Sequence, residues 1–234
     1  GSRFLAMPHS IAYPRAPVCC GPPAARPRLV ALCGRDEAAV AEAARRYGFE
    51  GYYVDWREML ADPRIALFDN CASADAHAAP TLAAIAAGKH VLCEKPLALR
   101  AADALAMWRA AEAAGVKHMT GFNYRFVPAV RYIRQLVDEG ALGTIYSFRA
   151  RYLQEGGDNP QRPYTWRHDR ARGGYGALGD IGVHIIDLAR YLVGEIVAVS
   201  AMTRAVVPQR PLAERPGALG EVTETMPTAG SATS

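Results

Sequence analysis

Lysine is scarce in this 234-residue chain, which has 27 lysines and arginines but only three lysines. Arginine keeps its proton in proteins, whereas a lysine beside a second positive charge or an apolar wall can lose it near neutral pH. Lys95 follows the apolar run 91–93, which predicts a buried strand, and ligands bind at the carboxyl ends of such strands in open α/β sheets. We therefore expect Lys95 to act in acid/base chemistry; the alternative is a surface lysine after a strand.

The chain also lacks long apolar runs and blocks of like charge. No run approaches the roughly 20 apolar residues that a membrane span needs, and no basic-then-apolar leader opens the sequence. The net charge of +4 is mild, and acidic residues separate the arginines. We expect a cytoplasmic protein that binds a small molecule, with no nucleic-acid or membrane partner.

Cysteine spacing gives no sign of a disulfide framework or a zinc site. The number of cysteines is odd, and none are spaced Cys-x-x-Cys. We interpret them as small buried hydrophobic residues in a reducing compartment. The alternative of a reactive cysteine is strongest for the adjacent pair Cys19 and Cys20, which lies in a Pro/Gly-rich segment.

The first half of the chain alternates between buried strands and helices. Periodicity predicts strands over 28–33, 65–71, 89–93 and 116–119, and helices over 36–47, 75–87 and 99–114. Strands separated by helices of this length indicate βαβ units and a doubly wound parallel sheet. The sequence therefore predicts an α/β, Rossmann-type domain over residues 1–121.

The pattern changes after residue 121. We expect a helix over 128–139, a half-exposed strand over 144–154, a long loop over 155–176, a helix over 180–192 and a strand over 196–204. These elements predict an α+β second domain over 122–222. Residues 223–234 have almost nothing to bury and are predicted to be disordered. An open sheet edge would favour a homo-oligomer.

Four motifs, in order, resemble one enzyme family. They are GKHVLCEKP at 88–96, GFNYRF at 121–126, WRHDR at 166–170 and GDIGVHIIDL at 179–188. Together they are similar to the Gfo/Idh/MocA oxidoreductases, named for glucose-fructose oxidoreductase and inositol dehydrogenase, over roughly residues 1–222. The resemblance implies hydride transfer between a nicotinamide cofactor, NAD or NADP, and a hydroxyl-bearing carbon of a sugar or polyol.

The resemblance also implies a site. Lys95 matches the family's catalytic lysine, and Asp180 and His184 match the aspartate and histidine that complete its active site. Residues that match the cofactor-binding positions are Phe4, Arg35, Asn70, Ala72, Ser73, His77, Glu94, Lys95, Asn123, Trp166 and Arg167. Residues that match the substrate positions are Tyr124, Arg125, Asp180 and His184.

Four alternatives stay open for the candidate residues. Asp180 and His184, four apart on a helix, could be an N-cap and a core histidine. With Asp187 they could bind a metal, but without a distinctive third ligand we predict no metal site. Asp36 could cap the helix that follows it, and His77 could be structural. Gly34 leaves room for a 2′-phosphate and Arg35 could pair with it, which favours NADP over NAD.

The expected dinucleotide fingerprint is altered. A strand and then G-x-G-x-x-G should precede a helix, but Arg3 and Ala6 occupy glycine positions and Pro8 falls in the expected first helical turn. Gly1 and Ser2 could instead be a cloning scar. The family also continues well beyond the length of this chain, so the resemblance implies that residues 122–222 are a partial C-terminal substrate domain with an open, mostly antiparallel sheet. The alternative function is therefore a truncated, non-catalytic dinucleotide-binding or partner-binding homologue.

Overall fold

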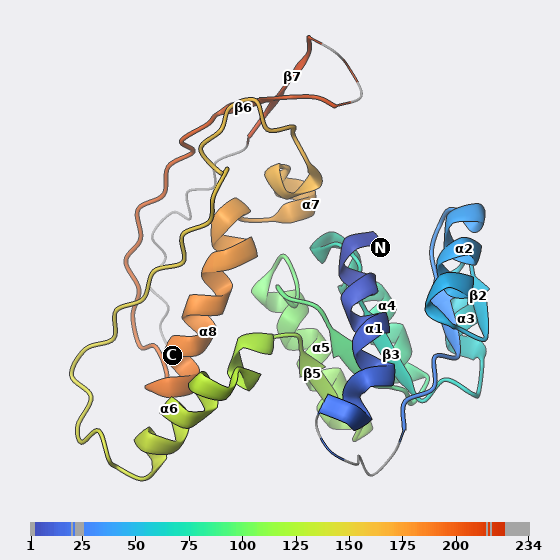
Figure 1. The fold of residues 1–234 in the computed structure, drawn as a ribbon, viewed down its shortest axis with the longest axis horizontal. Coiled ribbons are helices and arrows are strands. Elements are labelled where there is room, and N and C mark those ends of the chain that lie inside the picture. The colour runs from blue at the N-terminus through green and yellow to red at the C-terminus, as the bar shows by residue number, and fades with distance from the viewer. Residues whose placement is uncertain (1–2, 20, 22–25, 214, 216, 223–234) are drawn as a thin grey trace. The chain divides into compact units, whose positions relative to one another are not determined.

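The chain divides into two compact units, Gly1–Gly121 and Phe122–Ser234, each described by itself (Figure 1). The computed structural model describes residues 3–19, 21, 26–213, 215 and 217–222, without the side chains of residues 3–5 and 170. The predicted disorder of 223–234 concerns residues outside this set. Among the described residues, no helix combines the length and apolar character that crossing a bilayer requires.

The first unit contains two parallel sheets. In the smaller sheet β1 (Ala31–Cys33) pairs with β2 (Gly51–Tyr53), and in the larger one β4 (His90–Cys93) lies between β3 (Leu67–Asn70) and β5 (His118–Thr120). The Rossmann strand order 3-2-1-4-5-6 leaves such a pair and such a triplet when its strand 1 is omitted. The described residues include no counterpart of that strand, so the parallel Rossmann-type topology is present in two pieces.

The helices of the first unit alternate with its strands, starting with the helix before β1. They are α1 (Arg3–Cys19), α2 (Glu37–Tyr47), α3 (Trp56–Ala61), the short 3-10 turn η1 (Ala74–Ala76), α4 (Ala78–Ala86) and α5 (Ala101–Ala114). The Asp36 side chain accepts a hydrogen bond from Ala39 N, which caps α2. Gly48 ends that helix at φ 78°, in the left-handed region that glycine adopts without steric cost. The prediction that Asp36 caps a helix is confirmed.

The helix α1 corrects one expectation. Because α1 begins at Arg3, Pro8 lies in its second turn rather than its first, and Pro14 and Pro17 follow inside the same helix. Each interior proline removes one intrahelical hydrogen bond. The Ser10 hydroxyl donates to Ala6 O at 2.7 Å, which satisfies one carbonyl of this interrupted helix.

The core of the first unit lies between the larger sheet and α4 and α5. Its fully buried members include Ala84, Val91, Cys93, Met107 and Ala111, all 4% exposed or less. These residues are the apolar face of the predicted strand 89–93 and of the predicted helices. Burial at about 25 cal/mol per Å² is the main force that holds these layers together.

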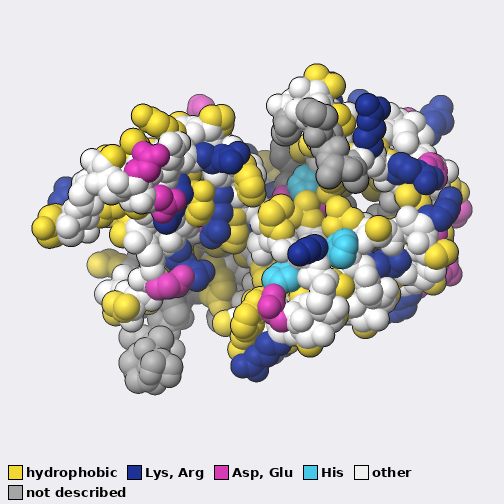
Figure 2. Space-filling model, turned by 90° about the horizontal axis from the view of Figure 1, so that it is seen from below, with side chains coloured by type: hydrophobic (Ala, Val, Ile, Leu, Met, Phe, Trp, Pro, Cys, Tyr) yellow, Lys and Arg dark blue, Asp and Glu magenta, His cyan; other side chains and the backbone are white. Residues whose placement is uncertain are grey.

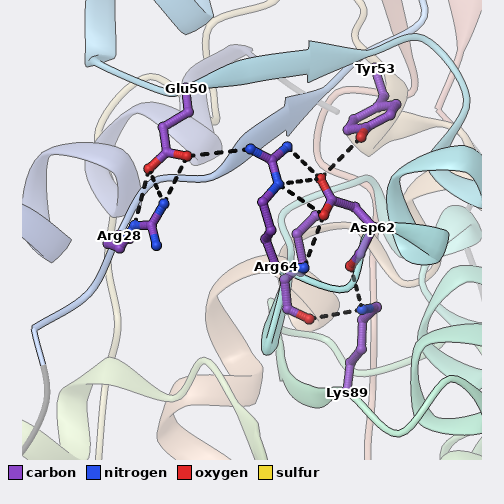
Figure 3. Close-up of polar contacts among 7 residues, drawn as sticks. Arg28, Glu50, Tyr53, Asp62, Arg64 and Lys89 are labelled. Atoms are coloured by element: carbon purple, nitrogen blue, oxygen red, sulfur yellow. Dashed lines mark hydrogen bonds and ion pairs between the residues drawn. The ribbon is translucent and has the colours of Figure 1, made fainter.

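A polar network crosses the loops between β2 and β4 (Figure 3). Lys89 is only 6% exposed, and its ammonium donates to Asp62 O at 2.9 Å and to Ile65 O at 2.8 Å. The Asp62 carboxylate accepts from Arg64 at 2.7 Å and from the Tyr53 hydroxyl at 3.1 Å. Lys89 therefore has a structural role, since it satisfies carbonyls at the end of α3.

Asp62 gives a prediction about acid stability. Hydrogen bonds from Arg64, together with one from Tyr53, hold the pKa of Asp62 below its usual range. A depressed folded-state pKa adds stability above the unfolded value of about 3.9, and that stability is lost as the pH falls toward the folded value. We expect Asp62→Asn to flatten the fall of unfolding free energy in acid, measured by urea titration at several pH values. The exposed carboxyl of α3, in Glu58→Gln, is the control; equal acid slopes for Asp62→Asn and wild type would contradict the expectation.

The second unit is helical with one hairpin. Its elements are η2 (Asn123–Phe126), α6 (Pro128–Asp138), η3 (Trp166–His168), α7 (Arg170–Gly173), the π-helical turn η4 (Leu178–Gly182), α8 (Val183–Leu192), β6 (Gln209–Pro211) and β7 (Leu219–Glu221). The strands β6 and β7 pair antiparallel. This hairpin was not predicted, because its strands are three residues long and turn-forming residues flank them.

Two strand predictions are wrong. Residues 144–154 and 196–204 form no strand in the structure, although their sequences alternate between apolar and polar residues. A strand needs a hydrogen-bonded neighbour and a face to pack against. The described part of the chain supplies neither, and Tyr146, Val197 and Met202 stay 92–94% exposed. Hydrophobic side chains reach the molecular surface in several groups (Figure 2).

Candidate active site

Polar side chains gather at the carboxyl ends of β3 and β4. We call His9, Asp69, Cys71, Glu94 and Lys95 the β-edge cluster. His9 Nδ1 lies 2.8 Å from Asp69 Oδ2, and His9 Nε2 lies 3.0 Å from Glu94 Oε1. The second Glu94 oxygen accepts the backbone N–H of Lys95 at 3.0 Å. The imidazole of α1 thus joins the ends of two strands, and one of its partners holds the Lys95 backbone.

The charges of the β-edge cluster follow from these contacts. Hydrogen bonds from the ring to Asp69, and then to Cys71 and Glu94, raise the pKa of His9 to about 12. Burial disfavours the Glu94 carboxylate, but its hydrogen bonds with His9 and Lys95 N outweigh burial and lower the pKa of Glu94. The ring is therefore an imidazolium between two carboxylates.

The thiols near this edge are not nucleophiles. Burial raises the pKa of Cys71 to about 11 and that of Cys93 to about 12. A reactive role needs a thiolate, which a low pKa provides. Cys19 is exposed, and Cys20 lies outside the described residues. Burial of Cys71 and Cys93 matches the interpretation of small hydrophobic residues.

Among the residues described, His9, Asp69 and Cys71 form a group whose donor atoms lie close enough for a metal ion. These atoms already bond to one another, at 2.8 Å for His9 with Asp69 and 3.4 Å for Cys71 with either partner. The group does not involve Asp180, His184 or Asp187, the set weighed from the sequence. We assign no metal to it.

Asn70 and His77 hold the loops beside Lys95. Asn70 Nδ2 donates to His77 O and to Thr81 Oγ1, both at 3.1 Å, and its Oδ1 accepts Ala72 N at 3.2 Å. The His77 ring, 1% exposed, lies 2.9 Å from Pro96 O and 3.0 Å from Ala72 O. Both side chains therefore shape the backbone around Ala72 and Pro96.

The end of β1 carries the predicted nucleotide-specificity residues. Arg35 is exposed, while the Asp36 carboxylate is engaged at the α2 N-terminus. A side chain at Gly34 would bring its Cβ within 3.3 Å of Val40, so this position is packed against α2. Phe4 lies in α1, but its side chain is outside the described residues.

In the second unit, an aromatic stack surrounds His184. The rings of Tyr124 and His184 stack with centroids 4.3 Å apart, and Phe122 meets His184 edge-on at 6.2 Å. The hydroxyls of Tyr124 and Tyr152 share a hydrogen bond of 2.6 Å. Tyr152 was missed in the sequence, where it is one of several aromatics in an alternating segment. The stack fixes the ring of His184, which is 7% exposed.

Two ion pairs engage other predicted residues. Arg125 binds Asp187 through two nitrogens, at 2.8 and 2.5 Å, and also lies over the Tyr191 ring. Arg167 Nε lies 3.3 Å from Asp180 Oδ2, and its guanidinium lies over the Trp166 ring. The Arg125 guanidinium therefore has a structural partner, which limits its freedom to bind a substrate.

The structure changes the geometry assumed for Asp180 and His184. Asp180 lies inside the π-helical turn η4, so it is not the N-cap of α8, and the four-residue spacing does not span a regular α-helix. Asn123 is exposed in η2. The predicted residues thus form two groups, one around Lys95 in the first unit and one around His184 in the second.

Comparisons with known proteins follow this division. Residues 11–122 match the model of the oxidoreductase family with an NAD-binding Rossmann fold, and residues 130–229 match that of the GFO/IDH/MocA C-terminal domain. The chain is 43% identical over 212 residues to a levoglucosan dehydrogenase of Pseudarthrobacter phenanthrenivorans, covering 91% of this chain and 54% of that protein. It is 34% identical over 182 residues to a D-apiose dehydrogenase of Paraburkholderia graminis, covering 76% and 46%.

A solved structure shows the same likeness. Levoglucosan dehydrogenase in complex with NADH and levoglucosan matches with a TM-score of 0.90 at 42% identity, covering 96% of this chain and 59% of that one. The predicted combination of a Rossmann-type domain with a C-terminal domain of this kind is confirmed. The chain spans about half the length of the curated relatives it matches.

Proposed function

Because this chain belongs to the Gfo/Idh/MocA family of oxidoreductases, we propose that it is an NAD(P)-dependent oxidoreductase acting on a hydroxyl-bearing carbon of a sugar, polyol or related small molecule. One observation carries the proposal. Lys95 stands at the carboxyl end of β4, and Glu94 anchors its backbone N–H at 3.0 Å. Ligands bind at this edge of a doubly wound sheet.

The described residues fit a dinucleotide at that edge. Arg35 follows β1 and is exposed, and the Ala72–Ser73 turn follows β3 with the Ser73 side chain not used as a helix cap. Lys95 follows β4. We propose that Arg35 binds the adenosine ribose end, that Ala72 and Ser73 line the diphosphate, and that Lys95, with Asn123, Trp166 and Arg167, borders the nicotinamide.

The chemistry divides between cofactor and chain. The nicotinamide supplies the hydride acceptor or donor. Lys95 takes the hydroxyl proton when the carbon is oxidised and returns it in the reverse direction. The proposed role of His184, whose ring is fixed by Tyr124, is to hydrogen-bond the substrate or shuttle its proton, and that of Asp180 is to position the substrate. Tyr124 and Arg125 border the substrate in this proposal.

The finer proposal is a preference for NADP. It is supported by the exposed Arg35 and by Asp36, whose carboxylate caps α2 instead of facing a ribose. We expect Arg35→Ala to weaken NADP binding by about tenfold, since a charge-assisted contact contributes about 1.5 kcal/mol, and to leave NAD binding unchanged. Calorimetric titration of both nucleotides measures this, with the exposed Arg57→Ala as control. Tighter NAD than NADP binding by the wild type would show NAD to be the cofactor, as in the NADH complex of the relative.

A second function has its own support. The altered glycine positions at Arg3 and Ala6 favour a dinucleotide-binding protein without turnover. A screen of sugars and polyols with the better-binding nucleotide separates the two. Nucleotide binding without turnover on any sugar or polyol supports this second function, and reduction of the nucleotide supports the first.

A further inference from the structure

We propose that His9 is a positioning residue for Lys95, holding the Glu94 carboxylate in place and offsetting its negative charge. The inference deepens the proposed function, and of its tests only the kinetic one rests on that function. Neither the family match nor the sequence motifs give His9 a role. Its position in α1 places it 85 residues from Glu94 in sequence but 3.0 Å away in space.

The first step of the argument is geometric. Glu94 is 8% exposed and uses one oxygen for His9 and the other for Lys95 N. A Cβ at Gly121 would lie 3.2 Å from Glu94 Oε1, so the carboxylate also packs against Gly121, the residue after β5. Contacts on both oxygens therefore hold the Glu94 carboxylate in place, and His9 supplies the contact to one of them.

The second step concerns charge. The interacting groups come from three elements. His9 and Tyr13 lie in α1, Asp69 lies in β3 and Cys71 follows that strand, and Glu94 and Lys95 follow β4. Tyr13 and Cys71 stay neutral because burial raises the pKa of each. The charged groups of this set are therefore two carboxylates, one imidazolium and one ammonium.

Removing the imidazolium changes that balance at Lys95. Both ring nitrogens face carboxylate oxygens, so each must carry a proton, and the ring is a cation. Without it, the Glu94 carboxylate keeps its electrostatic interaction with Lys95, and the compensating positive charge of His9 is lost. Nearby negative charge favours the ammonium over the neutral amine, the form that accepts a proton. His9 therefore helps keep Lys95 available as a base.

Competitive acetylation tests this without cofactor or turnover. The chain has three lysines, so peptide mass spectrometry can follow each one during reaction with acetic anhydride over a range of pH. Only the neutral amine reacts. We expect His9→Gln to move the midpoint of Lys95 labelling upward by about one pH unit, as for loss of one neighbouring like charge. Exposed Lys117 is the internal reference.

Tyr13→Phe is the matched control. It removes a hydroxyl that donates to the same Asp69 oxygen at 2.8 Å, yet Tyr13 does not contact Glu94. The Lys95 midpoint should stay unchanged in this variant. An unchanged midpoint in His9→Gln, or an equal shift in both variants, would overturn the proposal.

Two further readouts keep the test decisive. Buried Lys89 labels only when the fold opens, so its reactivity reports the integrity of each variant. If His9→Gln unfolds, Glu94→Gln serves instead; removing the carboxylate should lower the Lys95 midpoint, and a higher midpoint would refute the proposal. Where the wild type turns over, His9→Gln should shift the acid limb of kcat upward with the KM for nucleotide unchanged. A wild type without turnover would contradict the proposed function and leave the labelling result intact.

Discussion

Replacing Lys95 by methionine is expected to lower kcat by at least about 10²-fold, the usual contribution of a positioned general acid/base. Methionine keeps the unbranched side chain but has no proton to exchange. The anchoring contact of this residue uses its backbone N–H, which the variant retains, so Glu94 keeps its partner. Initial rates of nucleotide reduction with the substrate that the wild type oxidises would measure the effect.

The same variant separates chemistry from folding. Its urea midpoint should match that of the wild type, because Lys95 is half-buried at the carboxyl end of β4 and not in the core, and its nucleotide Kd shows whether the variant still binds the cofactor. Lys117→Met, at an exposed site next to β5, controls for loss of a positive charge and should turn over normally. Turnover by Lys95→Met at the wild-type rate would remove Lys95 from the mechanism.

Elements with local signals could be predicted from the sequence. The helix α2 has Asp36 at its N-cap and Gly48 at its end, and α5 ends at Gly115. Each of these boundaries is therefore marked by a capping residue that lies at the boundary itself. The strands β3 and β4 lie within the predicted strands 65–71 and 89–93, and Phe68, Val91 and Cys93 are buried. In these segments local preference and tertiary packing agree.

Elements that depend on a distant partner could not be predicted. Residues 144–154 and 196–204 have the alternation of strands, but strand formation depends on a neighbour that no local pattern reveals. The sequence also did not predict β2 (Gly51–Tyr53) and α3 (Trp56–Ala61), for a different reason. They are too short for periodicity to register, although Asp55 marks the start of α3 through its hydrogen bond with Arg57 N.

The site shows the same division. Lys95 and Glu94 stand out because the motif at 88–96 is contiguous. Tyr152 contacts Tyr124, which is 28 residues away in sequence, and His9 contacts Glu94, which is 85 residues away. A histidine or tyrosine carries no sequence signal of such a partner. Asp187 is a partial exception, since it extends the stripe of Asp180 and His184, but its partner Arg125 is also distant in sequence.

His77→Ala is expected to cause the largest loss of stability, about 3–5 kcal/mol of unfolding free energy. The ring is 1% exposed and lies against Pro96 O at 2.9 Å and Ala72 O at 3.0 Å. Alanine removes the ring that contacts these two carbonyls and opens a cavity about the size of an imidazole. Urea unfolding with an unchanged slope would measure the loss.

This variant also decides what His77 does. The family resemblance places it beside the cofactor, whereas its contacts join the Ala72 turn after β3 to the Pro96 segment that follows Lys95. A residue that acts mainly by holding these loops should lose stability when replaced, and nucleotide affinity should fall only as far as the loops loosen. His118→Ala, at an exposed histidine that bonds only to Glu112 in the described structure, should change stability by no more than about 0.5 kcal/mol. Equal stability losses in the two variants would mean that the buried ring contributes no more than a surface contact, and a loss of nucleotide binding in a fully stable His77→Ala protein would assign it to the cofactor instead.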